Sequence, residues 1–377
     1  MPLSKKDPDT TAIDPAIIHA LNINPASDTE IACTPHGGSG FGASSFKLTV
    51  TTPAPDKDNK PSTQSYFLKT GSGPEKSTMF RGEFFSLDAI HSVVPSLCPK
   101  PHGWGRMTAS EEKFFLLTDF LDLGKSSSGA TSSKGKSLSL AQKLAKLHTT
   151  PAPNPPGYEK PMFGFSVPTC CGATEQDNEW KECWIEFYAE NRLRRVLRQG
   201  VEAHGADKEL SDLVDVVADK VVPRLLGEVE RRGGITPVVI HGDLWSGNFG
   251  RGVFLPSSSS TGTATETVQE GNGNEDPEKA KWERADGQAE EVVYDPASVY
   301  GHSEYELGIM KMFGGFSGQF WKEYTELVGK AEPKEEWEDR VALYELYHHL
   351  NHFALFGGGY RSGAVGIMRR LVGKYGK

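Results

Sequence analysis

The sequence is poor in cysteine, with five in 377 residues, and no two of them form a C-x-x-C pair. An odd number of cysteines in a long chain is not the pattern of a disulfide-stabilised secreted domain. The adjacent Cys170 and Cys171 leave a metal-binding or redox role open. We favour the simpler interpretation, which is two reduced thiols in a loop.

The sequence also lacks a long apolar run and an excess of basic residues. No apolar stretch approaches the roughly 20 residues of a membrane-spanning helix, and the opening MPLSKKDPDTTA has no apolar core of a signal peptide. The net charge of −9 argues against nucleic acid or an anionic membrane as the main partner. We therefore expect a cytoplasmic, monomeric protein that binds neither nucleic acid nor membrane.

The length of the chain suits two lobes, each with its own core. For the first lobe, residues 1–120, alternating apolar residues predict a strand over 46–50, and YFLK (66–69) predicts a second. Residues 76–91 have apolar residues at helical spacing. The second lobe, residues 121–377, is predicted to be mainly helical. Its helical patterns cover residues 138–148, 180–199 and 209–231.

Residues 255–291 differ in composition from the rest of the chain. They contain nine acidic and three basic side chains, so most of the net charge lies in this stretch. With so few apolar residues, the stretch cannot offset the entropy lost on ordering. We predict a disordered acidic insertion at a hairpin tip. Predicted strands lie on either side of it, at 238–241 and 291–297.

The segment PVVIHGDLWSGN (237–248) places an aspartate and an asparagine five residues apart, directly after a buried-looking strand. The catalytic loop of protein kinases reads H-R-D-L-x-x-x-N, and here only the arginine is changed, to Gly242. In such a loop the aspartate accepts the proton of the attacking hydroxyl, and the asparagine is a Mg²⁺ ligand. The pattern assigns these roles to Asp243 and Asn248. The alternative is a surface turn that both residues cap.

A second carboxylate follows the next predicted strand, in VVYDPA. Asp295 stands where kinases have the aspartate of D-F-G, but Pro296 and Ala297 replace the phenylalanine and glycine. We interpret Asp295 as the main Mg²⁺ ligand, although an aspartate at a strand end can also simply cap a turn.

Lys69 and Glu83 explain each other's unusual positions. Lys69 ends a predicted strand, where kinases have their phosphate-binding lysine. Glu83 lies within the apolar stripe of the next predicted helix, where an unpaired charge would be costly.

The chain also has a glycine-rich segment before the first of the predicted strands, which departs from G-x-G-x-x-G. Its candidate phosphate-binding glycines are Gly37, Gly38 and Gly40.

Four segments of the chain resemble the fructosamine-3-kinase (ketosamine-3-kinase) family. They are HGDLWSGN, YDPASVYGHSEYELGIMKMFGGF, HHLNHFALFGGGYRSG and FGFSVPTCCGATEQDNEW. The resemblance extends from about residue 30 to 372, outside the acidic stretch. It implies an α+β, two-lobed protein-kinase-like fold, with a small N-terminal antiparallel β lobe and a larger, mainly α-helical C-terminal lobe.

The resemblance further implies ATP- and Mg²⁺-dependent phosphorylation of the sugar 3-hydroxyl of fructosyl-lysine or ribulosyl-lysine. The acceptors would be glycated proteins or free ketosamines, and the phosphorylated sugar would then be lost, which is protein repair by deglycation. Asp243 would be the catalytic base, Asn248 and Asp295 would bind Mg²⁺, and Lys69 and Glu83 would hold the ATP phosphates.

By the same resemblance, Asp119, Phe120 and Leu121 would form the hinge that meets adenine. Trp245 and His302 would face the sugar. For Trp245 the alternative is core packing, and for His302 it is a structural hydrogen bond.

Two rival functions stay open on the sequence. HGDLxxGN alone is shared with aminoglycoside and choline kinases, so a small-molecule kinase of the same fold is one rival. A non-catalytic scaffold is the other, but the intact set of charged residues argues against it.

The histidine cluster at 348–352 has no further ligand spaced to complete a zinc site. We interpret it as helix packing near the acceptor cleft.

Overall fold

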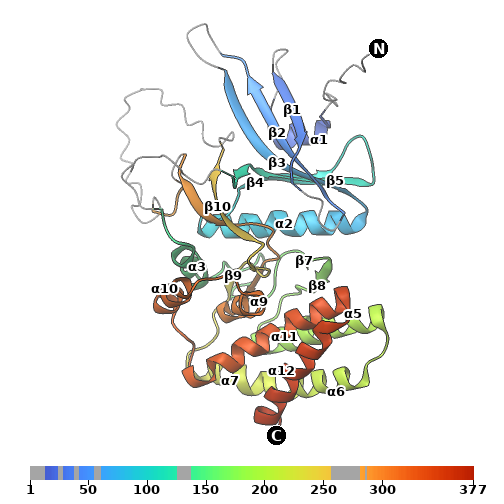
Figure 1. Ribbon diagram of the computed structural model, residues 1–377, viewed down its shortest axis with the longest axis vertical. Helices are drawn as coiled ribbons and strands as arrows, with labels where there is room; N and C mark the ends of the chain where they lie inside the picture. Colours follow the sequence, from blue (N-terminus) through green and yellow to red (C-terminus); the bar gives the residue numbers. More distant parts are fainter. Residues whose placement is uncertain are drawn as a thin grey trace, which may run out of the picture.

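The computed structural model describes most of the chain as two lobes, with a twisted sheet and one long helix above a mainly helical part (Figure 1). The described residues are 13–23, 29–37, 42–54, 61–124, 137–255, 281–284 and 287–377. The predicted glycines Gly38 and Gly40 lie outside these ranges. None of the helices within them is long and apolar enough to cross a membrane.

The N-terminal lobe is a five-stranded sheet in the order β1-β2-β3-β5-β4, in which all neighbours are antiparallel. Its elements are α1 (Pro15–Ala20), β1 (Glu30–Pro35), β2 (Ser44–Thr52), β3 (Ser62–Ser72), α2 (Pro74–Val93), β4 (Pro101–Arg106) and β5 (Lys113–Asp119). The two predicted strands lie within β2 and β3 and pair with each other, and the predicted helix lies within α2. These predictions are therefore confirmed.

The C-terminal lobe contains the following elements. They are β6 (Leu121–Asp122), α3 (Leu140–Thr149), β7 (Thr169–Cys171), β8 (Thr174–Gln176), α4 (Trp184–Phe187), the π-helical η1 (Tyr188–Arg194), α5 (Arg195–His204), α6 (Lys208–Val216), the π-helical η2 (Val217–Val221), α7 (Val222–Arg232), β9 (Val238–Ile240), β10 (Phe249–Phe254), β11 (Ala289–Val293), β12 (Val299–Gly301), the 3-10 turn η3 (Ser303–Tyr305), α9 (Glu306–Phe313), α10 (Gly318–Val328), the 3-10 turn η4 (Lys334–Glu336), α11 (Trp337–Phe356) and α12 (Gly359–Tyr375). The three predicted helical patterns correspond to α3, to α4–η1–α5 and to α6–η2–α7.

Two small sheets lie near the junction of the lobes. β9 pairs with β12, and β10 lies between β11 and β6. The chain passes from β5 to β6 through Phe120 alone, so the connection between the lobes is short. Buried aromatic and aliphatic side chains fill each lobe, and a further buried cluster joins α2 of the N-terminal lobe to α3, β9 and α9 of the C-terminal lobe. In the C-terminal lobe they centre on Trp184 and on the tyrosines of α11, whereas Leu48, Tyr66 and Leu117 lie in the N-terminal core.

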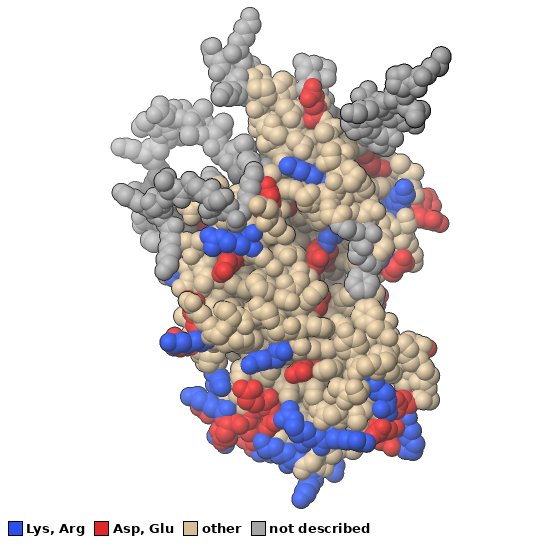
Figure 2. Space-filling model, viewed as in Figure 1, with Lys and Arg blue, Asp and Glu red and all other residues tan. Residues whose placement is uncertain are grey.

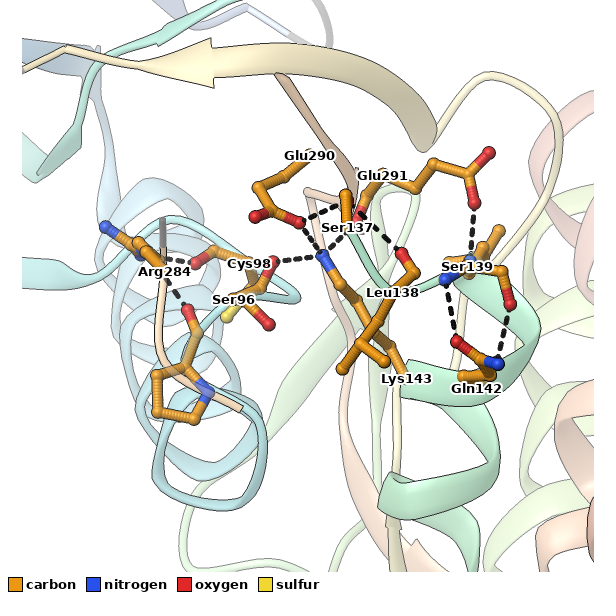
Figure 3. A network of polar contacts seen from close by, with 12 residues as sticks. Ser96, Cys98, Ser137, Leu138, Ser139, Gln142, Lys143, Arg284, Glu290 and Glu291 are labelled. Carbon is orange, nitrogen blue, oxygen red and sulfur yellow. Dashed lines mark hydrogen bonds and ion pairs between the residues drawn. The ribbon is translucent and has the colours of Figure 1, made fainter. Parts of the chain in front are cut away.

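The prediction of disorder over 255–291 is wrong at the C-terminal end of that stretch. Residues 256–280 and 285–286 lie outside the described part of the chain, but 281–284 pack on the fold and β11 begins at Ala289. Figure 3 shows Arg284 and Glu290 within a network of polar contacts. Glu290 is buried against Lys143 of α3, at 2.6 Å. The prediction failed here because it was based on amino-acid composition. Composition does not reveal that an acidic residue has a buried partner elsewhere in the chain.

Candidate active site

A cavity of about 500 Å³ lies between the lobes. Figure 2 shows a hollow between the two lobes, near side chains of both charges. Most of the predicted site residues line the cavity. These are Gly37, Lys69, Glu83, Asp119, Leu121, Asp243, Trp245, Asn248 and Asp295. The fold therefore brings residues that are far apart in the sequence into one space.

Lys69 is held by two carboxylates, one from each lobe. Its position in β3, opposite Leu116 of β5, places it at the cavity. Its Nζ lies 2.7 Å from Glu83 Oε1 on α2 and 2.6 Å from Asp295 Oδ1. Burial alone would lower the pKa of Lys69, but Asp295 and Glu83 outweigh it and raise the pKa, so the lysine stays a cation. The predicted Lys69–Glu83 pair is thus present in the structure.

The segment HGD is fixed by a buried carboxylate. The backbone N–H groups of His241 and Gly242 donate to the two carboxylate oxygens of Glu306, at 2.5 and 3.0 Å. Gly242 has φ +81°, and a Cβ there would lie 2.2 Å from Ala297 O. The chain therefore needs glycine where protein kinases have arginine, because the segment after Asp295 passes directly against the loop.

Asp243 is oriented through both of its carboxylate oxygens. Cys171 Sγ lies 3.5 Å from Oδ1, and Asn248 Nδ2 donates to Oδ2 at 3.2 Å and to the Asp243 carbonyl at 2.9 Å. Burial raises the pKa of Asp243 to about 8, which these hydrogen bonds offset only in part. Since the amide nitrogen of Asn248 is used here, its amide oxygen is the atom that could meet a metal ion.

Asp295 is brought to Asn248 by the backbone. The N–H of Tyr294 donates to the Asn248 carbonyl at 3.0 Å, and the N–H of Ala297 donates to the His241 carbonyl at 2.9 Å. Asp295 itself has φ +58°, which is unusual for a residue with a side chain. Backbone strain of this kind is found at sites where the surrounding structure fixes one orientation of a side chain.

Two of the three residues predicted to form the hinge lie at the cavity. Leu121 lines the cavity, and so does Asp119. The Asp119 carboxylate, however, is bonded to protein groups: His102 Nε2 lies 2.7 Å away, the Lys100 N–H donates at 3.0 Å, and Arg284 forms an ion pair with it. These contacts hold the pKa of Asp119 well below its usual range, although burial alone would raise it. Its carboxylate therefore stabilises the hinge.

Phe120 is not among the residues that line the cavity. Its ring is buried, 4.8 Å from the ring of His36, and Lys47 Nζ lies 4.6 Å from its centroid. Its carbonyl accepts a hydrogen bond from Leu255 N–H at 3.0 Å. The Phe120 ring is therefore not part of the cavity wall, and the place of Phe120 in a hinge that meets adenine stays a prediction.

Of the two residues predicted to face the sugar, the structure places only Trp245 at the cavity. Its ring is 38% exposed and lies over Gly247, where a Cβ would come within 2.3 Å of it. His302 is buried, and its Nδ1 lies 2.8 Å from the Tyr344 hydroxyl. The assignment of His302 to the sugar is wrong, and the alternative of a structural hydrogen bond is what the structure shows.

Two residues near Asp243 were missed. Glu306 could have been found by the argument that identified Glu83, because it is a carboxylate within an apolar helical run. Cys171 was interpreted as a loop thiol, but it lies in β7 and is 1% exposed. No local signal in the sequence indicates that this strand crosses the HGD segment.

Comparison with known proteins identifies the family. The sequence model described as fructosamine kinase matches residues 57–374. The chain is 34% identical to the ketosamine-3-kinase of Mus musculus over 322 residues, which cover 81% of this chain and 87% of the mouse protein. The chain belongs to the fructosamine kinase family. The chain is also 31% identical to the chloroplastic protein-ribulosamine 3-kinase of Arabidopsis thaliana, over 81% of this chain and 75% of the plant protein.

Solved structures show the same fold. The putative fructosamine-3-kinase from Thermobifida fusca superposes with a TM-score of 0.60 at 21% identity, covering 96% of this chain and 98% of the other. That from Haemophilus somnus gives 0.57 at 19% identity, over 91% and 92%. The predicted α+β, two-lobed protein-kinase-like class is therefore confirmed.

Proposed function

We propose that this fructosamine kinase transfers the γ-phosphoryl group of ATP to the sugar 3-hydroxyl of ketosamines such as fructosyl-lysine or ribulosyl-lysine. The observation that carries the proposal is that one cavity is lined by Lys69, Asp243, Asn248 and Asp295. These are the groups that phosphoryl transfer requires, in a chain whose relatives are named ketosamine-3-kinase and protein-ribulosamine 3-kinase. The phosphorylated adduct would be labile, so the amine would be released.

Each residue has a role that follows from its contacts. Asp243 accepts the proton of the attacking hydroxyl, and its two donors, Cys171 and Asn248, keep the carboxylate in one orientation. Lys69 binds the phosphates of ATP, and Glu83 keeps it in place. Glu306 acts on Asp243 only through the backbone that it holds.

The residues present also fit Mg²⁺. Glu83 and Asp295 share a single ammonium group and Asp243 lies close by, so three carboxyl groups face one cation in the cavity. Asn248 and Asp295 would hold the ion, which neutralises charge on the phosphates when bound. Mg²⁺ sites commonly use one or two side chains together with phosphates and waters. The described residues accordingly contain no group of three or more His, Cys, Asp or Glu that could hold a metal.

The proposal is tested by measuring ATP consumption with fructosyl-lysine, ribulosyl-lysine, kanamycin and choline, with the Asp243→Asn variant as control. We expect turnover with the two ketosamines that depends on Mg²⁺ and disappears in the variant. Transfer to kanamycin or choline in preference to both ketosamines would favour the rival small-molecule kinase. No Asp243-dependent transfer to any acceptor would favour the scaffold.

A further inference from the structure

An uninterrupted series of aromatic rings runs from the cavity across the C-terminal lobe. The rings of Trp245 and Phe313 are 5.7 Å apart, and those of Phe313 and His352 are 5.0 Å apart. His352 in turn lies 5.8 Å from Phe356 and 5.0 Å from Tyr360. We call these five residues the aromatic track. They come from the catalytic loop, the end of α9, the end of α11 and the start of α12.

Three of the five residues of the aromatic track are exposed, and His352 and Tyr360 are partly buried. The track is also uncharged. Six large hydrophobic side chains are exposed in the described part of the chain, and three belong to the track: Trp245 at 38%, Phe313 at 36% and Phe356 at 58%. Burial lowers the pKa of His352, so its ring is neutral at pH 7. Exposed aromatic residues that lie together in this way are characteristic of binding surfaces.

The track begins where an acceptor must leave the cavity. The hydroxyl that reacts has to reach Asp243, and Trp245 follows two residues later in the same loop and lines the same cavity. The hinge and Lys69 occupy the part expected to hold the nucleotide. An acceptor that extends past Trp245 would meet α9, α11 and α12. α9 and α12 each pack against α11, and all three lie in the C-terminal lobe, below the sheet and α2 (Figure 1). Charged side chains gather instead at the foot of this lobe (Figure 2).

We propose that the aromatic track is a docking surface for the polypeptide that carries the ketosamine, and that it makes protein-bound ketosamines better substrates than free ones. The inference rests on the proposed function. The occupant is the chain on either side of the modified lysine, whose apolar and aromatic side chains pack against Phe313, Phe356 and Tyr360. Aromatic side chains are well suited to this because they offer a large contact area at a small loss of side-chain entropy.

The test compares kcat/KM for a glycated protein with kcat/KM for free fructosyl-lysine in Phe356→Gln and Tyr360→Ser. Phe356 lies at the exposed end of its helix, so its replacement should leave folding intact. Truncation of an aromatic anchor typically costs about 5- to 30-fold in binding. We expect a loss of that size with the glycated protein, mostly in KM, and less than about a twofold change with the free compound. Leu327→Gln, which alters an equally exposed residue on α10 (51%) outside the track, is the matched control and should change neither.

The outcomes separate the two proposals. If the unaltered enzyme phosphorylates neither fructosyl-lysine nor ribulosyl-lysine, whether free or on a protein, the proposed function fails; if only ribulosyl-lysine is accepted, the comparison is made with the ribulosylated protein and free ribulosyl-lysine. If it phosphorylates both the free and the protein-bound compound, and the variants lose activity equally on both or on neither, the docking proposal fails. Light scattering tests whether a second copy of this chain, instead of a substrate polypeptide, covers the aromatic track. A dimer that Phe356→Gln separates into monomers, with no change in the ratio of the two activities, would assign the track to a second copy of this chain and overturn the proposal.

Discussion

Breaking the buried ion pair between Lys143 and Glu290 by removing one partner is expected to destabilise the fold strongly. Lys143 Nζ lies 2.6 Å from Glu290 Oε2, 2.8 Å from the Ser96 carbonyl and 2.9 Å from the Glu291 carbonyl (Figure 3). The two side chains are 0% and 4% exposed. One ammonium group thus joins α3, β11 and the segment after α2, which come from separate parts of the sequence.

Lys143→Met removes all three of these hydrogen bonds at once. Glu290 keeps the Ser137 hydroxyl at 2.9 Å, but its charge loses the only cation that it pairs with among the described residues. Removing one partner of a buried ion pair costs about 3–5 kcal/mol. Unfolding entropy is about 2.1 cal/mol/K per residue, so for 377 residues this loss corresponds to a melting temperature lower by about 4–6 °C.

Thermal and urea unfolding of the purified variant measure this loss. The double variant Lys143→Met/Glu290→Leu is expected to recover much of it, because an apolar pair of similar volume leaves no unpaired charge. Lys208→Met is the matched control, since Lys208 is 87% exposed and pairs with Asp212 at the surface; it should not change the melting temperature measurably. A loss below about 1 kcal/mol in Lys143→Met would refute the reasoning.

Four further predictions concern the site. Asp243→Asn is expected to retain the fold and ATP binding but to lower turnover by about 10²–10⁴-fold; a variant with more than about a tenth of the original turnover would remove it from the role of base. Lys69→Ala and Glu83→Ala should show less than additive losses in a double-mutant cycle of kcat/KM, whereas strict additivity would mean that they act independently. Replacing residues 256–280 with a short Gly-Ser linker should preserve activity and melting temperature, because closure entropy depends weakly on loop length; a large fall in either would show that the segment packs on the fold. Arg284→Gln is expected to raise the KM for ATP several-fold at nearly constant kcat, because the guanidinium holds the hinge; an unchanged KM would contradict this.

The parts of the fold that could be predicted from the sequence carry a local signal. Alternating apolar residues identified β2, and the helical spacing of Phe80, Leu87 and Ile90 identified α2, because each of these elements buries one face. The loop from His241 to Asn248 could be assigned from its residue types and spacing alone. The chemistry requires that carboxylate and that amide at that separation.

The partners of buried polar groups could not be predicted in the same way. His302 was assigned to the sugar by the resemblance to the family, yet its ring turns inward to Tyr344 on α11. Phe120 was assigned to the hinge in the same way, and its ring packs against that of His36 in the N-terminal lobe. In both cases the decisive contact is tertiary. The local pattern of residues does not reveal which distant element packs against the side chain.

Three glutamates show which buried charges can be predicted from the sequence and which cannot. Glu83 and Glu306 stand in apolar helical patterns, so the cost of an unpaired buried charge predicts a donor for each. The structure supplies Lys69 for the first and two backbone N–H groups for the second. Glu290 is more deeply buried than Glu83, with 4% of its side chain exposed against 11%, but it follows an acidic, polar stretch, and averaging over that stretch assigned it to solvent. Its partner Lys143 lies 147 residues away in the chain. Glu290 therefore differs from the other two glutamates in the pattern of its immediate neighbours. A buried charge can be predicted from one sequence where the surrounding residues already indicate burial. It is missed where the average composition of a polar stretch hides a short buried strand such as β11.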